Sequence, residues 1–153
     1  MFKSSRGVFM DPKSRPSLEQ IQNVFMKDQL PESFGIEIQE VGEDFVIGVL
    51  TVDSRHLRPG NIMNGGVSLV LIETMGSISS CLYIDLAKQN SFGIQVNANH
   101  ISIALPGDKL TARSKAIHIG KTTQIWDVDI SNQKGKLVSS GRITMLVTDR
   151  SKK

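Results

Sequence analysis

The residues with the clearest potential for chemistry are two adjacent glycines and a glutamate in an apolar part of the sequence. Gly65 and Gly66 follow Asn64, and Glu73 stands seven positions after Gly66. Glycines at the start of a helix let a ligand approach unpaired backbone N–H groups at the positive end of the helix dipole. Such donors stabilise an oxygen that becomes negative, while a carboxylate can attack a carbonyl carbon or activate water. These are the two kinds of group that hydrolysis of an acyl group requires.

Each of these residues also has a structural interpretation. An Asn-Gly pair can simply cap a helix, and Glu73 can form a structural hydrogen bond across a dimer interface. Ser77 lies one turn after Glu73 on the same helix face. Its hydroxyl can orient a water molecule beside the carboxylate, or its small size can allow close helix packing. The residue types alone leave both interpretations open.

The distance between the glycines and the glutamate limits how they can act together. At ~1.5 Å per residue, their separation places Glu73 about 10 Å from Gly66 along the helix axis. A single carbonyl group cannot reach both. If both act on one substrate, the helix start of one subunit must face Glu73 of another. We therefore predict a homodimer that forms the site, and a tetramer is a further possible assembly.

The pattern of apolar and polar residues predicts the elements that position this site. The stretch 66–87 is apolar on nearly every face, so a helix there must be covered on most sides. Alternation with a period of two indicates strands before and after it. A curved antiparallel sheet around one long helix, an α+β architecture, satisfies both patterns. The expected elements are a helix at 17–28 that Pro31 ends, strands at 34–41 and 45–52, a loop at 53–65, the long helix at 66–87, and strands at 94–100, 110–119, 122–130 and 137–147.

Length and composition suit one globular domain. The chain has 153 residues, and we expect a loose lead-in at 1–16, a single domain at 17–148 and a charged tail at 149–153. The net charge of +3 comes from scattered Lys and Arg residues, which argues against a nucleic-acid partner. Glu73 and Asp85 make it costly for the long apolar stretch to cross a bilayer, so we expect no membrane association.

Cysteine and histidine usage indicates the compartment and excludes two kinds of site. The lone Cys81 cannot form an intramolecular disulfide, and it lies in an apolar stretch where a small buried side chain is expected. These features favour a cytoplasmic location. The three histidines lack the spacing of metal ligands, so no metal site is predicted.

Four segments, in order, resemble the hot-dog thioesterases of the phenylacetate-pathway, or 4-hydroxybenzoyl-CoA thioesterase-like, type. That family has His-Gly-Gly followed by an acidic residue eight positions after the first glycine, and Gly65 and Glu73 have this spacing. The resemblance covers about residues 34–148 and implies the hot-dog fold. The matching segments are 62–77, 96–100, 118–126 and 141–144.

The resemblance implies hydrolysis of an acyl-CoA thioester to a free acid and coenzyme A. Glu73 would act as base or nucleophile, and the backbone N–H groups of Gly65 and Gly66 would polarise the carbonyl. Two positions depart from the family: Asn64 replaces its usual His, and Arg58 replaces an Asn or Gln that helps to polarise the carbonyl. Asn64 or Arg58 can still add a side-chain donor.

The same resemblance indicates where the substrate would bind. Coenzyme A is part of the substrate, so no separate cofactor is expected. Arg113, Lys115 and Arg142 can assist in binding phosphates, although each can equally be a solvated surface charge. The predicted substrate-binding residues are His56, which occupies a position where many members carry His, with Arg58, Asn97, Gly120, Lys121 and Thr122.

Two other functions fit the sequence less well. A hot-dog enoyl hydratase or dehydratase would use His56 as a general base, but Glu73 lies about one turn too late for that pairing. A non-catalytic acyl-CoA sensor would explain the replacements at Arg58 and Asn64 as lost catalysis. A repressor of that kind needs a DNA-binding module, and the residues before the first strand offer one helix instead of two.

Overall fold

The computed structural model describes residues 2–3, 9–10 and 15–150. Most of the lead-in expected at 1–16 and the last part of the tail expected at 149–153 therefore lie outside the described residues. The described part of the lead-in includes two short strands, β1 (Phe2–Lys3) and β2 (Phe9–Met10), which pair antiparallel.

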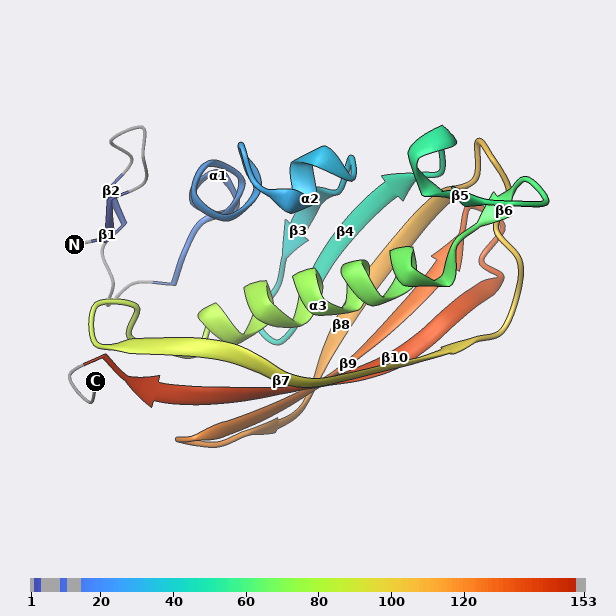
Figure 1. The fold of residues 1–153 in the computed structure, drawn as a ribbon. Coiled ribbons are helices and arrows are strands. Elements are labelled where there is room, and N and C mark those ends of the chain that lie inside the picture. Colours follow the sequence, from blue (N-terminus) through green and yellow to red (C-terminus); the bar gives the residue numbers. More distant parts are fainter. Residues whose placement is uncertain (1, 4–8, 11–14, 151–153) are drawn as a thin grey trace.

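One antiparallel sheet curls around one long helix (Figure 1). Its strand order is β3-β4-β8-β9-β10-β7, so β3 and β7 form the two edges. The helix is α3 (Gly65–Cys81), and it packs against the strands on the inner face of the sheet. This α+β hot-dog arrangement confirms the fold class predicted from the sequence. The six strands are β3 (Glu37–Val41), β4 (Val46–Thr51), β7 (Gln89–His100), β8 (Lys109–Ile119), β9 (Thr123–Asn132) and β10 (Leu137–Asp149).

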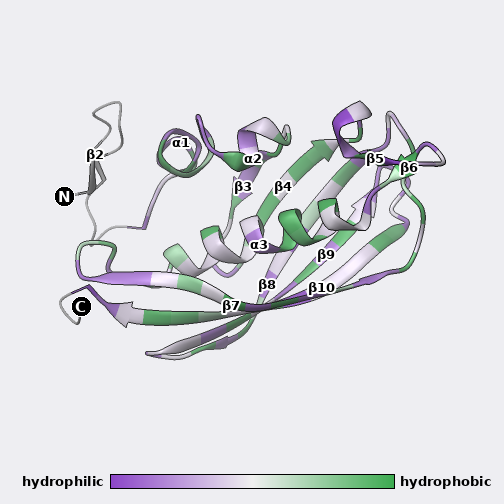
Figure 2. Cartoon of the chain, in the orientation of Figure 1, coloured by the Kyte–Doolittle hydropathy of each residue, from purple (hydrophilic) through white to green (hydrophobic). Residues whose placement is uncertain are grey.

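The core lies between α3 and the inner face of the sheet. Alternate residues of β9 and β10 point toward the helix, and Trp126, Ile143 and Met145 among them are fully buried. The residues between them face outward, where the Arg142 guanidinium bonds the Asp127 carboxylate. Apolar segments accordingly run along α3 and in short stretches along the strands beneath it (Figure 2).

The long helix ends earlier than the sequence predicted. The apolar pattern continues to residue 87, but α3 ends at Cys81. The chain turns because Asp85 captures nearby backbone groups: its carboxylate accepts from the Ala87 N–H, and its carbonyl accepts from the Lys88 and Gln89 N–H groups. Strand β7 then begins at Gln89, five residues before the predicted start.

The N-terminal helical segment is interrupted. It starts as α1 (Leu18–Ile21) behind the predicted Ser17 and Gln20 capping box, then continues as the π-helical turn η1 (Gln22–Met26). Pro31 was expected to end this helix. Instead it lies in the first turn of a second short helix, α2 (Leu30–Ser33), where a proline is tolerated because its missing N–H would be unpaired anyway.

The segment expected to be a loop at 53–65 is more ordered than predicted. It contains a 3-10 turn, η2 (Ser54–His56), followed by a small antiparallel pair, β5 (Leu57–Arg58) and β6 (Ile62–Met63). The Asn64 N–H donates to the His56 carbonyl, which closes the segment on itself immediately before α3. The start of the long helix is therefore anchored by its own preceding loop.

Candidate functional site

The start of α3 is capped by Asn64. Its side-chain oxygen accepts from the Gly66 N–H at 2.8 Å, and its carbonyl accepts from the Val67 N–H at 3.0 Å. The capping interpretation of Asn64 is therefore correct, and the Gly66 N–H is already bonded. Among the hydrogen bonds of the described residues, the Gly65 N–H has no acceptor. Of the two donors predicted here, Gly65 alone is available to a ligand.

His100, at the end of β7, lies directly against this helix start. A Cβ placed on Gly65 would lie 2.7 Å from the His100 Nε2. The His100 Nδ1 lies 3.3 Å from the Ser139 hydroxyl, which itself donates to the Asn99 carbonyl. Because that hydroxyl hydrogen is used, the network assigns the proton to Nδ1 and leaves Nε2 as an acceptor facing Gly65. Sequence reasoning missed this role, although a histidine on the inward-facing positions of an alternating strand was the available signal.

A pocket of about 550 Å³ opens at the start of α3, and we call it the helix-start pocket. Arg58, Gly65, His100 and Lys136 contribute its polar groups, and β6 and the segment 101–104 after β7 supply apolar walls. Ser68 also lines it. Among the described residues, the Ser68 hydroxyl is the buried side-chain polar atom that has no hydrogen-bond partner. A buried hydroxyl without a partner is costly, so this pocket offers an unsatisfied polar group.

Glu73 faces a different pocket. Its side chain is half-buried, and the Ser77 hydroxyl lies 3.4 Å from its Oε1, as the shared helix face predicted. Its carboxylate lies so close to Gly93 of β7 that a Cβ there would overlap it. We call the surrounding cavity, of about 290 Å³, the glutamate pocket. It is lined by Phe25, Pro31, Glu73, Thr74, Ser77, Ile78, Cys81 and Ser91.

The two pockets share no lining residue among those described. Gly65 contacts one and Glu73 the other, on the same helix. Within one chain, the free backbone donor and the carboxylate therefore cannot meet a single carbonyl group. The geometric separation inferred from the sequence is present in the structure.

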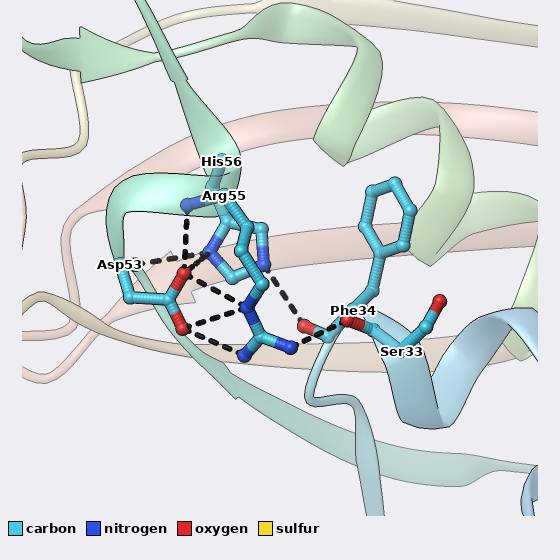
Figure 3. Close-up of polar contacts among 5 residues, drawn as sticks. All are labelled: Ser33, Phe34, Asp53, Arg55 and His56. Atoms are coloured by element: carbon cyan, nitrogen blue, oxygen red, sulfur yellow. Dashed lines mark hydrogen bonds and ion pairs between the residues drawn. The ribbon is translucent and has the colours of Figure 1, made fainter.

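His56 is part of the scaffold (Figure 3). It is 1% exposed, its Nδ1 accepts from the Asp53 N–H, and its Nε2 contacts the Phe34 carbonyl at 2.9 Å. With Nδ1 accepting, Nε2 must carry the proton and donate. In this arrangement neither ring nitrogen is left for a substrate or for use as the general base of a dehydratase.

Arg55 and Asp53 extend this scaffold (Figure 3). The Arg55 guanidinium pairs with the Asp53 carboxylate and donates to the Ser33 carbonyl. Hydrogen bonds from the Arg55 side chain and backbone lower the pKa of Asp53 to about 2. Together with His56 they tie the loop before α3 to the end of α2. Arg55 is thereby engaged, while Arg58, in the next strand, stays exposed and reaches only the Pro59 carbonyl.

The other predicted substrate-binding residues lie away from Gly65. Asn97 is exposed and pairs in register with Arg142, which faces the outer side of the sheet. Gly120, Lys121 and Thr122 form the turn between β8 and β9, where the Thr122 carbonyl accepts from Val147.

The distance along β10 shows how far apart these groups are. His100, next to Gly65, pairs with Ser139 near one end of β10, whereas Val147 is near the other. The eight positions between Ser139 and Val147 span about 26 Å at ~3.3 Å per residue. The structure does not bring the turn together with the helix start of the same chain. Arg142, considered for phosphate binding, is held by Asp127 instead.

Cys81 lines the glutamate pocket, but its chemistry is suppressed. Burial raises the pKa of its thiol to about 12. The thiolate, which is the nucleophilic form, is therefore scarce near neutral pH. This agrees with the expected role of Cys81 as a small apolar side chain.

None of the helices formed by the described residues has the length and apolar character to cross a membrane.

Comparison with known proteins identifies the family. The family model described as "Thioesterase superfamily" matches residues 60–139, which include both pockets' α3 residues. The chain belongs to the thioesterase superfamily. A putative esterase of Pseudomonas aeruginosa is 36% identical, with 88% of this chain and 92% of that protein covered. A 1,4-dihydroxy-2-naphthoyl-CoA hydrolase of Listeria monocytogenes is 37% identical, with 80% and 98% covered.

Solved structures agree with this assignment. A mutant thioesterase from P. aeruginosa has a TM-score of 0.84 at 34% identity, with 90% of this chain and 97% of that chain covered. A Staphylococcus aureus thioesterase in which a glutamine is replaced by alanine has a TM-score of 0.75 at 34% identity, covering 78% and 98%. The same S. aureus protein has also been solved with a glutamate replaced by alanine. This thioesterase is thus a hydrolase of thioesters.

The unpartnered Ser68 hydroxyl gives a test of the helix-start pocket. We expect Ser68→Ala to change the free energy of unfolding by less than about 1 kcal/mol, because the lost hydroxyl has no hydrogen bond to lose. Ser79 is an equally buried control on the same helix, and its hydroxyl bonds both the Met75 carbonyl and Ser114. Ser79→Ala should cost about 1–3 kcal/mol, because Ser114 loses a partner. Urea unfolding measures both, and equal losses would contradict the unpartnered state of Ser68.

Proposed function

We propose that this thioesterase hydrolyses acyl-CoA thioesters to a free acid and coenzyme A. Glu73 acts as base or nucleophile, and the Gly65 N–H polarises the carbonyl. The observation that carries the proposal is that Glu73 faces a cavity beside Ser77, while Gly65 presents the one free N–H of the capped helix start. Coenzyme A as the leaving group is supported by the name of the L. monocytogenes hydrolase. We assign the reaction to the cytoplasm.

The proposed reaction breaks the bond between the carbonyl carbon and the thiol sulfur. Glu73 either removes a proton from the attacking water or attacks the carbonyl carbon itself, giving an anhydride that water then opens. In both cases the carbonyl oxygen gains negative charge, which the Gly65 N–H and the helix dipole stabilise. Coenzyme A leaves as the thiol after it takes up a proton.

The S. aureus structures support the choice of Glu73 and draw attention to Arg58. The replaced glutamine and glutamate in that protein are separated by the same number of positions as Arg58 and Glu73 here. Arg58 lines the helix-start pocket together with Gly65. We propose that the Arg58 guanidinium donates a hydrogen bond to the carbonyl oxygen, as a neutral glutamine amide at the corresponding position would do.

The proposal includes a homodimer in which each site combines the helix-start pocket of one chain with the glutamate pocket of the other. Such dimers can also assemble into a tetramer. The separation of the two pockets supports this. So does β7, an edge strand whose Phe92, Ile94 and Val96 side chains are 53%, 59% and 36% exposed. Edge strands with apolar side chains favour pairing with another chain.

Two alternatives are distinguished by specific residues. A dehydratase needs an available His56, and both of its ring nitrogens are engaged within the loop. A sensor without catalysis would bind acyl-CoA and release no thiol. The half-buried Glu73 beside Ser77 favours catalysis, because a sensor has no need of a carboxylate at that point.

We expect Glu73→Ala to lower kcat for thiol release by at least about a hundredfold, because the site loses its base or nucleophile. A panel of CoA esters with a thiol-reactive dye measures the rate. Glu37→Ala, an exposed carboxylate on β3, serves as control and should retain the rate. Undiminished turnover in Glu73→Ala would contradict the proposed mechanism, and absence of turnover in the native protein would favour the sensor.

We expect two inactive variants to restore activity when they are mixed. Glu73→Ala removes the carboxylate, and Gly65→Ala places a methyl group against His100 at the free N–H. If each site of a symmetric dimer uses both chains, unfolding and refolding a one-to-one mixture should recover about a quarter of the native rate, because half the dimers then contain one intact site. Each variant refolded alone is the control. No recovery, although mass spectrometry shows mixed dimers, would exclude the shared site.

We expect Gly93→Ala to disable the enzyme without unfolding it. A Cβ at this position would occupy the space of the Glu73 carboxylate, so Glu73 must turn away, and a displacement of about 1 Å at a catalytic group can cost ~100-fold in rate. Gln95→Ala changes an exposed residue of the same strand that lines neither pocket, and it should keep activity. Full activity in Gly93→Ala, with an unchanged melting temperature, would show that Glu73 need not hold this position.

A further inference from the structure

The N-terminal helical segment supplies one wall of the glutamate pocket. Phe25 and Pro31 line this cavity together with Glu73 and Ser77. The remaining walls come from α3 and from Ser91 at the start of β7. A segment more than 40 positions away in sequence is therefore in contact with the space beside the carboxylate. The sequence placed Phe25 within the helix predicted at 17–28 and indicated no functional role for it.

A π-helical turn fixes the position of Phe25. The Lys27 N–H donates to the Gln22 carbonyl at 3.0 Å, a step of five residues. Ile21 and Met26, also five positions apart, are both buried, at 0% and 5% exposed. In an α-helix, residues five apart point about 140° away from each other, at ~3.6 residues per turn. The wider turn keeps both side chains in the core, and Phe25 then contacts the pocket.

A contact with the sheet also holds the π-helical turn in place. The Gln22 side-chain amide donates to the Ile38 carbonyl of β3 at 3.1 Å, which ties the π-helical turn to the edge of the sheet. π-helical turns are rare, and those that do occur are frequently found at functional sites. Here the turn has an identifiable result: it seats an aromatic ring at the wall of the cavity that contains Glu73.

The chemistry of the pocket limits what can enter it. Glu73 is the one charged residue among those lining it, so a second carboxylate on the acyl group would be repelled. Phe25, Pro31 and Ile78 provide apolar surface. An apolar cavity of ~150 Å³ is known to accept a benzene molecule. About 290 Å³ therefore accommodates one ring with its carbonyl group, or a short chain.

We propose that Phe25 determines acyl specificity, and that the glutamate pocket accepts a compact, uncharged apolar acyl group. This inference rests on the proposed function, because it places the acyl group beside Glu73. The ring of Phe25 closes the path that a longer chain would follow. Removing it lengthens the pocket, and the preference moves toward longer acyl groups while the reaction at Glu73 is unchanged.

Thiol release from benzoyl-CoA and from straight-chain CoA esters of two to twelve carbons tests this. For the native protein we expect the highest kcat/KM with benzoyl or short chains. In Phe25→Ala, the kcat/KM for long relative to short chains should rise at least about tenfold, because each methylene admitted to an apolar pocket is worth ~10-fold or more. Phe25→Leu should show a smaller shift in the same direction and provides a milder change if the alanine variant does not fold.

Phe45→Ala is the matched control. It removes a ring that is half-buried like Phe25 but lies outside the pocket, against the Arg113 guanidinium, and it should leave the chain-length profile unchanged. A folded Phe25→Ala and Phe25→Leu with the native profile would overturn the assignment of Phe25 while thioester hydrolysis stands. A native preference for long chains or dicarboxylic acyl groups would also overturn it. If the native protein releases no thiol from any ester, the proposed function itself fails.

Discussion

The structure depends on the enclosure of one helix that is apolar on nearly every side. Leu71, Ile72 and Met75 of α3 are fully buried, and each contributes about 1.5–3 kcal/mol through its removal from water. A flat sheet covers one side of a helix, but a curled one covers most of its circumference. The curl of the six strands thus matches the apolar surface that α3 presents. Gly65 and Glu73 of α3 line pockets because the sheet does not cover the helix completely at those two points.

Polar residues set the rotation of the helix within the sheet. The Ser79 hydroxyl pairs with Ser114 on β8, and the Ser80 hydroxyl pairs with Ser91 on β7. These contacts connect α3 to strands on both sides of it. They direct Glu73 and Ser77 toward the glutamate pocket. The buried hydroxyl that the sheet leaves unpaired, Ser68, lies at the other pocket, where a ligand is expected. Among the described residues, the one buried side-chain polar atom without a hydrogen-bond partner therefore lies at the proposed site.

Sequence reasoning succeeded where a local pattern determines the structure. Alternation located the six main strands, and the Asn-Gly-Gly signal located the start of α3 to within one residue. It failed where the structure depends on a contact with a residue that is distant in the sequence. His56 looked available until the Phe34 carbonyl, 22 positions earlier, proved to hold its ring. Apolar residues after Cys81 continued the helical pattern, but Asp85 redirected the backbone. The alternation of its strand indicated that His100 faces inward, but its place beside Gly65 depends on the pairing of β7 with β10, which is distant in sequence.

The replacement of a neutral amide by Arg58 has a physical consequence in the proposed dimer. In the single chain the Arg58 guanidinium is exposed, so water screens its effect on a carbonyl. The partner that brings Glu73 to the helix-start pocket also displaces that water. The attraction between a positive group and a developing negative oxygen then strengthens several-fold as the local dielectric constant falls. The Gly66 N–H is already bonded to Asn64, so one backbone donor remains and a full positive charge offsets the missing one. Dimer formation would accordingly both complete the site and raise the strength of its carbonyl-polarising groups.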